Sequence, residues 1–208
     1  MLALSDGVFA FAITLVLDLV MPVATTRNVW TDLLHGWPQF LAYVISFATI
    51  GAVWLAHTAI TDHLVRTDST FLRLNLLVLL LVSFMPYPTR FLSTFIESDH
   101  PEQVAVTIYG ITVLLLVGLL YLLWWYADRE GHFDSGAAEE ELGVFTRRMV
   151  PGIATYVVLI VVAWFLPLVA VFGYAAIACY FIVPFRARLV RRVGATSTSR
   201  RRPRWFTR

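Results

Sequence analysis

The sequence predicts an all-α integral membrane protein with six transmembrane helices in each subunit. Hydrophobic residues make up 59% of the 208 positions and charged residues only 14%, which leaves too little polar surface for a water-soluble globule. Uncharged runs of about 20 residues, the length that crosses a bilayer as a helix, recur along the chain. We predict one transmembrane domain over residues 1–185 and a basic tail over 186–208, with spans at about 3–22, 37–60, 71–95, 103–127, 149–166 and 168–185.

Prolines mark several of these limits. The second span begins beside Pro38, and Pro86 and Pro88 are expected to kink or fray the far end of the third. Residues 149–185 carry no charge, but a single helix of that length would measure about 55 Å, far more than one bilayer. Two spans must therefore share this run, and Pro167 is the natural break between them.

The distribution of arginine predicts that both termini are cytoplasmic. The chain has no lysine, and with six spans fourteen of its sixteen basic residues fall on the side of the termini. Only Arg27 and Arg90 fall on the opposite side. By the positive-inside rule, we expect a multi-pass protein of the cell membrane with both ends inside the cell.

Two charged segments are predicted to lie outside the membrane. The tail 186–208 contains nine arginines with Trp205 and Phe206 among them, a composition that can bind nucleic acid. Directly after a cytoplasmic span, such a segment is more typical of contact with anionic lipid headgroups or of disorder, so no nucleic-acid partner is predicted. The acidic connection 128–141 is interpreted as a solvated loop.

The sequence carries no enzyme signature. It has neither a Gly-x-Ser-x-Gly nucleophile elbow nor a phosphate-binding Gly-x-x-x-x-Gly-Lys loop. Cys179 has no partner for an internal disulfide. The histidines form no pair four residues apart, so neither a metal site nor a cofactor is predicted; they are His35, His57, His63, His100 and His132.

The first span holds the most informative polar residues. A charge within a span costs a few kcal/mol, about 2.5–3.5 on the insertion scale, and normally faces a bundle interior or a water-filled path. Helical spacing places Phe11, Thr14, Leu15 and Asp18 on one face. If copies of this face surrounded an axis, its apolar side chains would form constrictions that resist wetting, and Asp18 would attract cations.

A second group of polar residues is expected at the cytoplasmic end. Ser5 and Asp6 in the first span, His57 in the second and Asn75 in the third fall at similar depth. Mutual hydrogen bonds would satisfy groups that are costly in hydrocarbon, so we predict a cluster that anchors the first helix. Proton sensing by His57 is the alternative role, because histidine titrates near neutral pH.

Residues 4–15 read Leu-Ser-Asp-Gly-Val-Phe-Ala-Phe-Ala-Ile-Thr-Leu and resemble the Phe-Ser-Asp signature of the transmembrane protein 175 family. Two further blocks follow in order: Trp54-x-x-His57, and Asn75-Leu-Leu continuing to Pro86-Tyr87-Pro88-Thr89. The three blocks cover about the first 90 residues, and beyond them the match rests on hydrophobic pattern and span count. The chain is identified as a bacterial or archaeal member of this family.

The resemblance implies a potassium-permeable channel. Animal members are endosomal and lysosomal, and six-span bacterial and archaeal relatives assemble as homotetramers around a central pore lined by the first helices, without a re-entrant loop. By position in the signature, Phe11 falls at the hydrophobic constriction and Leu15 at a second apolar layer. Thr14 falls at a hydroxyl position associated with ion selectivity, and Trp54 joins the polar network.

The chain departs from the family pattern in three places. The family's usual arginine, four residues before its Phe-Ser-Asp, would lie before Met1. Phenylalanine at position 11 is bulkier than the usual isoleucine, which implies a tighter constriction. The run Leu15-Val16-Leu17-Asp18 is one residue shorter than the common pattern, so either Leu17 or Asp18 faces the axis.

The resulting hypothesis is a homotetrameric potassium channel gated by dewetting at Phe11 and Leu15. The ion path would continue past Thr14 and Asp18, with K⁺ as the permeant ion. The alternative is a proton-coupled secondary transporter that uses Asp6 and His57, although the sequence shows no inverted repeat. A structural membrane scaffold is the third possibility.

Overall fold

The computed structural model describes residues 2–20, 36–97, 103–133 and 138–198. Residues 21 and 22 of the first predicted span, and residues 199–208 of the predicted tail, lie outside this part of the chain. The described residues are almost entirely helical: α1 (Leu2–Val20), α3 (Trp37–Thr61), α4 (Ser69–Phe84), α5 (Pro86–Glu97), α6 (Gln103–Arg129), α7 (Ala138–Ala163) and α8 (Pro167–Thr198).

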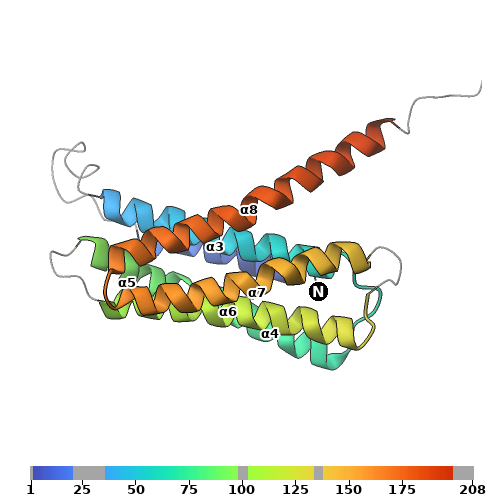
Figure 1. The fold of residues 1–208 in the computed structure, drawn as a ribbon, viewed down its shortest axis with the longest axis horizontal. Coiled ribbons are helices and arrows are strands. Elements are labelled where there is room, and N and C mark those ends of the chain that lie inside the picture. The colour runs from blue at the N-terminus through green and yellow to red at the C-terminus, as the bar shows by residue number, and fades with distance from the viewer. Residues whose placement is uncertain (1, 21–35, 98–102, 134–137, 199–208) are drawn as a thin grey trace, which may run out of the picture.

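The helices lie side by side in a bundle, and the distal part of α8 extends away from it (Figure 1). Helix α1 packs on α3, α4 and α5, while α6 packs on α4, α5 and α7. Helix α8 lies against α3 and α7. Within the described chain, three segments are long and apolar enough to cross a membrane, namely Trp37–Thr61, Ser69–Thr94 and Gln103–Arg129. Two shorter apolar helical segments follow, Met149–Ala163 and Pro167–Ile182.

The third predicted span is interrupted at Met85. Helix α4 ends at Phe84 and α5 begins at Pro86, because proline has no N–H to continue the hydrogen-bond ladder. The Met85 N–H instead bonds the Val82 carbonyl at 3.2 Å, and the Thr89 N–H bonds the Met85 carbonyl at 3.2 Å. The helix therefore breaks in the middle of the apolar segment, not only at its far end.

The last two helices are longer than their predicted spans. Helix α7 ends at Ala163 and α8 begins at Pro167, the proline expected to separate them. However, α7 begins at Ala138, so the end of the predicted acidic loop is helical. Helix α8 continues to Thr198, through the first part of the predicted tail.

The start of α4 is fixed by a side-chain cap. Asp68 is the N-cap, and its carboxylate accepts a hydrogen bond of 2.8 Å from the Phe71 N–H. The other carboxylate oxygen accepts from the Tyr126 hydroxyl of α6. The same turn is tied to the end of α6 by a 2.9 Å bond from the Val65 N–H to the His132 carbonyl, which follows Gly131 at a φ of +62°.

Replacing Asp68 by alanine is expected to lower the Tm, and by less in acid. The Tyr126 hydroxyl, followed by the Phe71 N–H, lowers the pKa of Asp68 from its usual value of 3.8. Because the folded pKa is the lower one, this carboxylate stabilises the fold above the unfolded pKa, and the contribution is lost as the pH falls through the folded pKa. The Tm values of the variant and wild type should therefore converge below about pH 4.

Thermal unfolding between pH 3 and 7 measures this convergence. Asp62→Ala removes an exposed carboxylate at the other end of the same turn and is the matched control. A difference between Asp68→Ala and wild type that stays constant across this pH range would contradict the linkage.

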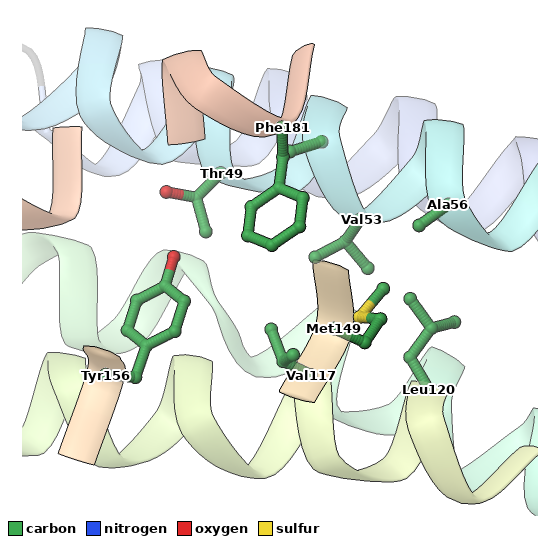
Figure 2. A pocket seen from close by; sticks show the side chains of 9 residues that line it. Thr49, Val53, Ala56, Val117, Leu120, Met149, Tyr156 and Phe181 are labelled. Atoms are coloured by element: carbon green, nitrogen blue, oxygen red, sulfur yellow. The ribbon is translucent and has the colours of Figure 1, made fainter. Parts of the chain in front are cut away.

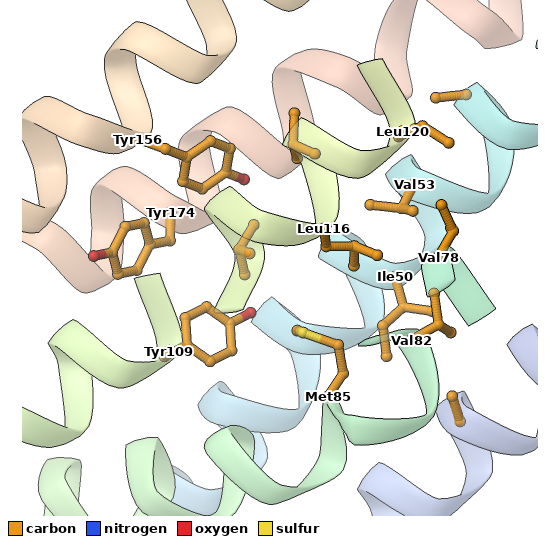
Figure 3. Close-up of a cluster of buried hydrophobic side chains, with 14 of the residues drawn as sticks. Ile50, Val53, Val78, Val82, Met85, Tyr109, Leu116, Leu120, Tyr156 and Tyr174 are labelled. Carbon is orange, nitrogen blue, oxygen red and sulfur yellow. The ribbon is translucent and has the colours of Figure 1, made fainter. Parts of the chain in front are cut away.

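A continuous apolar core fills the bundle. Side chains from α3, α4, α6, α7 and α8 interdigitate, and Figure 3 shows Ile50, Val82 and Leu116 at the centre. Three buried tyrosines extend the core toward α7 and α8: the Tyr109 and Tyr174 ring centroids are 5.6 Å apart, and those of Tyr156 and Tyr174 are 5.9 Å apart. This core packs together the helices that α1 contacts.

Candidate functional site

Helix α1 has two distinct faces. Ser5, Phe9, Ala12 and Val16 are buried against the bundle at helical spacing. The opposite face is exposed along its length, and we call it the outer stripe of α1; its residues are Leu4, Gly7, Phe11, Thr14 and Asp18. The outer stripe does not contribute to the core of the subunit.

The outer stripe contains three of the four residues that the sequence predicts for an ion path. Phe11 is 64% exposed, and Thr14 and Asp18 are exposed on the same face. Leu15 is only partly exposed, because it lies at the flank of the stripe, one residue beyond Thr14. Leu17 and Asp18 are both exposed, so exposure does not distinguish which of the two faces the predicted axis.

The chemistry of the stripe changes along the helix. The Thr14 hydroxyl donates to the Phe11 carbonyl at 2.9 Å, so its oxygen keeps its acceptor positions. Asp18 lies one turn farther and has no hydrogen-bond or ion-pair partner among the described residues. An apolar aromatic ring, a hydroxyl oxygen and a carboxylate therefore follow one another, and the last two can interact with a cation.

Behind the stripe, the structure brings together the polar residues of the predicted anchoring cluster. The His57 Nε2 donates to the Asn75 Oδ1 at 2.7 Å, and the Asn75 Nδ2 lies 3.4 Å from the Ser5 hydroxyl. All three side chains are buried. The Phe9 ring covers His57, with 5.5 Å between the ring centroids, so α1, α3 and α4 meet at this cluster.

Asp6 and Trp54 form a separate contact beside the cluster. The Trp54 indole N–H donates to the Asp6 Oδ1 at 2.9 Å, which joins α1 to α3. Both residues are exposed, Trp54 by 38%. Asp6 therefore sits at the edge of the subunit surface and not inside the buried cluster.

Asn75→Ala is expected to destabilise the fold by about 1–2 kcal/mol, because His57 and Ser5 each lose a buried partner. Thermal unfolding of the purified protein measures the effect. Ser83→Ala is the control. Ser83 lies on the same helix, and its hydroxyl donates only to the carbonyl of Leu79, one turn earlier in that helix. An unchanged Tm in Asn75→Ala would mean that the buried bonds contribute nothing to stability.

A third polar group, which the sequence did not predict, lies in the middle of the bundle. The Ser46 hydroxyl lies 2.8 Å from that of Thr89 and 3.2 Å from that of Tyr109, and the Tyr109 hydroxyl donates to Thr49 at 3.2 Å. We call these four residues the hydroxyl cluster, which joins α3, α5 and α6. A sequence signal for this cluster was available: Ser46 and Thr49 lie three residues apart, and so on one helix face, in an uncharged span.

The described residues contain no group of three or more histidine, cysteine or acidic side chains that could hold a metal ion. His57 bonds Asn75, and His63 Nδ1 lies 2.7 Å from the Ala59 carbonyl of its own helix. Polar side chains in this region therefore bond one another and the backbone.

Comparison with known proteins places these features in a family. Residues 1–86 match the family model described as endosomal/lysosomal potassium channel TMEM175. A potassium channel of Streptomyces collinus is 39% identical over 135 residues, which cover 64% of this chain and 66% of that protein, slightly less than two thirds. The mouse endosomal/lysosomal proton channel TMEM175 is 30% identical over 133 residues, 59% of this chain and 26% of that protein.

A solved structure extends the similarity to nearly the whole chain. The crystal structure of a lysosomal potassium-selective channel TMEM175 homolog from Chamaesiphon minutus matches with a TM-score of 0.75 and 32% sequence identity. The match covers 88% of this chain and 95% of that one. The family and these relatives are channels and not enzymes, which confirms the prediction of a non-enzymatic membrane protein. The chain belongs to the TMEM175 family.

Proposed function

We propose that the protein is a potassium-permeable cation channel that assembles as a homotetramer with α1 lining a central pore. The observation that carries the proposal is the outer stripe of α1, where Phe11, Thr14 and Asp18 are exposed on a helix of a multi-pass membrane protein. A carboxylate in contact with lipid is costly, whereas one in a water-filled path is not. The names of the relatives support a channel for cations.

In this proposal the gate is hydrophobic. Four copies of Phe11, with Leu15 at their flank, form an apolar constriction from which water and ions withdraw when it is narrow. Thr14 oxygens then offer partial replacement of the hydration shell, and four Asp18 carboxylates raise the local concentration of K⁺. No bound cofactor takes part.

The polar cluster and the Asp6–Trp54 contact would support this pore. Ser5, His57 and Asn75 fasten the buried face of α1 to α3 and α4. The outer stripe therefore keeps its orientation, and its side chains take no part in these hydrogen bonds. Both termini are placed in the cytoplasm of the proposed assembly. The arginine-rich end of the chain would then lie near anionic headgroups of the cell membrane.

Potassium flux into liposomes that contain the purified protein tests the proposal. Wild type, Phe11→Ala and Leu15→Ala are compared with protein-free liposomes, and the mass of the particle in detergent reports the tetramer. A lack of flux in all three proteins would overturn the channel proposal and leave a scaffold. Transport that requires a pH gradient, saturates with substrate and is lost in His57→Ala would favour the transporter that uses Asp6 and His57.

A further inference from the structure

A small cavity lies next to the hydroxyl cluster, between α3, α6, α7 and α8. Its volume is about 20 Å³, and its lining includes Thr49, Val53, Val117, Met149, Tyr156 and Phe181 (Figure 2). One water molecule requires about 10–15 Å³ measured in this way. The cavity is thus large enough for a single water and too small for an organic ligand.

Tyr156 supplies an unused polar group to this cavity. The residue is 2% exposed, and its hydroxyl has no hydrogen-bond partner among the described residues. Figure 2 shows the hydroxyl pointing from α7 toward the side of α3 that carries Thr49. The hydroxyl is therefore free to donate a hydrogen bond to a molecule in the cavity.

Thr49, on the opposite wall, can accept one more hydrogen bond. Its hydroxyl donates to the Ile45 carbonyl at 2.9 Å and accepts from the Tyr109 hydroxyl at 3.2 Å. A hydroxyl oxygen has two acceptor positions, and one of them remains unused. No direct hydrogen bond joins Thr49 to Tyr156 among the described contacts.

We propose that this cavity binds one structural water, which accepts a hydrogen bond from Tyr156 and donates one to Thr49. The water extends the hydroxyl cluster from α3, α5 and α6 to α7. Since the other lining side chains are apolar, two hydroxyls hold the molecule, and both are needed. Helix α7 is thereby linked by polar contacts to α3, against which α1 packs.

The sign of the Tyr156→Phe effect tests the proposal on the full-length protein. If water bridges the two hydroxyls, Tyr156→Phe lowers the Tm by about 2–4 °C. Thr49→Val lowers the Tm by more, because it also removes the acceptor of the Tyr109 hydroxyl. The double variant then loses less than the sum of the two shifts, because either change breaks the bridge. In a dry cavity the Tyr156 hydroxyl is an unsatisfied donor, so its removal leaves the Tm unchanged or raises it.

Two control variants and a high-resolution density map complete the experiment. Tyr180→Phe and Thr155→Val delete the same groups from exposed positions on α8 and α7 and should leave the Tm unchanged. A high-resolution density map of wild type should show one peak at about 2.7–3.2 Å from both oxygens. An unchanged or raised Tm in Tyr156→Phe, additive shifts in the double variant, or a map without this peak would each overturn the proposal.

Discussion

Phe11→Ala is expected to raise potassium flux into liposomes by at least about tenfold. In the proposed tetramer the change removes four aromatic rings from the narrowest part of the pore, so the free-energy barrier to wetting falls. A barrier lower by about 1.4 kcal/mol already corresponds to a tenfold rate. Isotope or fluorescence-based potassium uptake, normalised to the amount of reconstituted protein, measures the change.

Replacing Phe11 by side chains of different size separates the effect of pore width on flux from the effect of losing an aromatic ring. Phe11→Ile should give an intermediate flux, since isoleucine is smaller than phenylalanine but still apolar. Phe172→Ala is the matched control, because Phe172 is exposed on α8 away from α1, and its flux should equal that of wild type. Equal flux in wild type and Phe11→Ala would place the constriction at another residue even if the channel conducts.

Gly110→Ala is expected to destabilise the fold by about 3 kcal/mol, at the upper end of the range for overpacked cores. A Cβ at position 110 would overlap the Tyr174 hydroxyl oxygen and would lie 2.9 Å from the Ile160 side chain. Tyr174 cannot move aside easily, because its ring packs between those of Tyr109 and Tyr156. The free energy of unfolding, or the Tm at matched detergent concentration, measures the loss.

Two further variants make this prediction specific. Gly118→Ala on the same helix meets no atom within 4 Å and should be neutral or stabilising, because alanine favours the helix. Tyr174→Phe should partly restore the stability of Gly110→Ala by removing the oxygen that overlaps the new methyl group. Equal stability of the two alanine variants would contradict the close contact between α6 and α8.

The helix limits illustrate how far local sequence signals reach. Pro38 and Pro167 predicted where helices begin, because proline fits the first turn of a helix and cannot continue a preceding one. The interruption at Met85 was expected only as a kink or fraying nearby. The helical start of α7 was missed, because charged residues just before a span can form the first turns of a helix as easily as a loop.

The anchoring cluster at the cytoplasmic end was easier to predict than the individual hydrogen bonds within it. A buried polar group in a membrane protein needs a partner, so Ser5, His57 and Asn75 at similar depth were expected to meet. Helical periodicity also placed Phe11, Thr14 and Asp18 on one face. Leu15 lies at the flank of that face, because adjacent positions in a helix point about 100° apart and the neighbouring helices cover one side.

Composition alone was enough to predict an all-α membrane protein, and the Ser-Asp-Gly segment with two further blocks was enough to identify the family. Composition and motif are local properties of the chain, so they need no knowledge of packing. The packing of the helices was needed to show that Asn75 bonds both His57 and Ser5, that Asp6 pairs with Trp54, and that hydroxyls of three helices lie together in the core. These contacts join residues far apart in the sequence, and their geometry depends on how the helices rotate and approach one another.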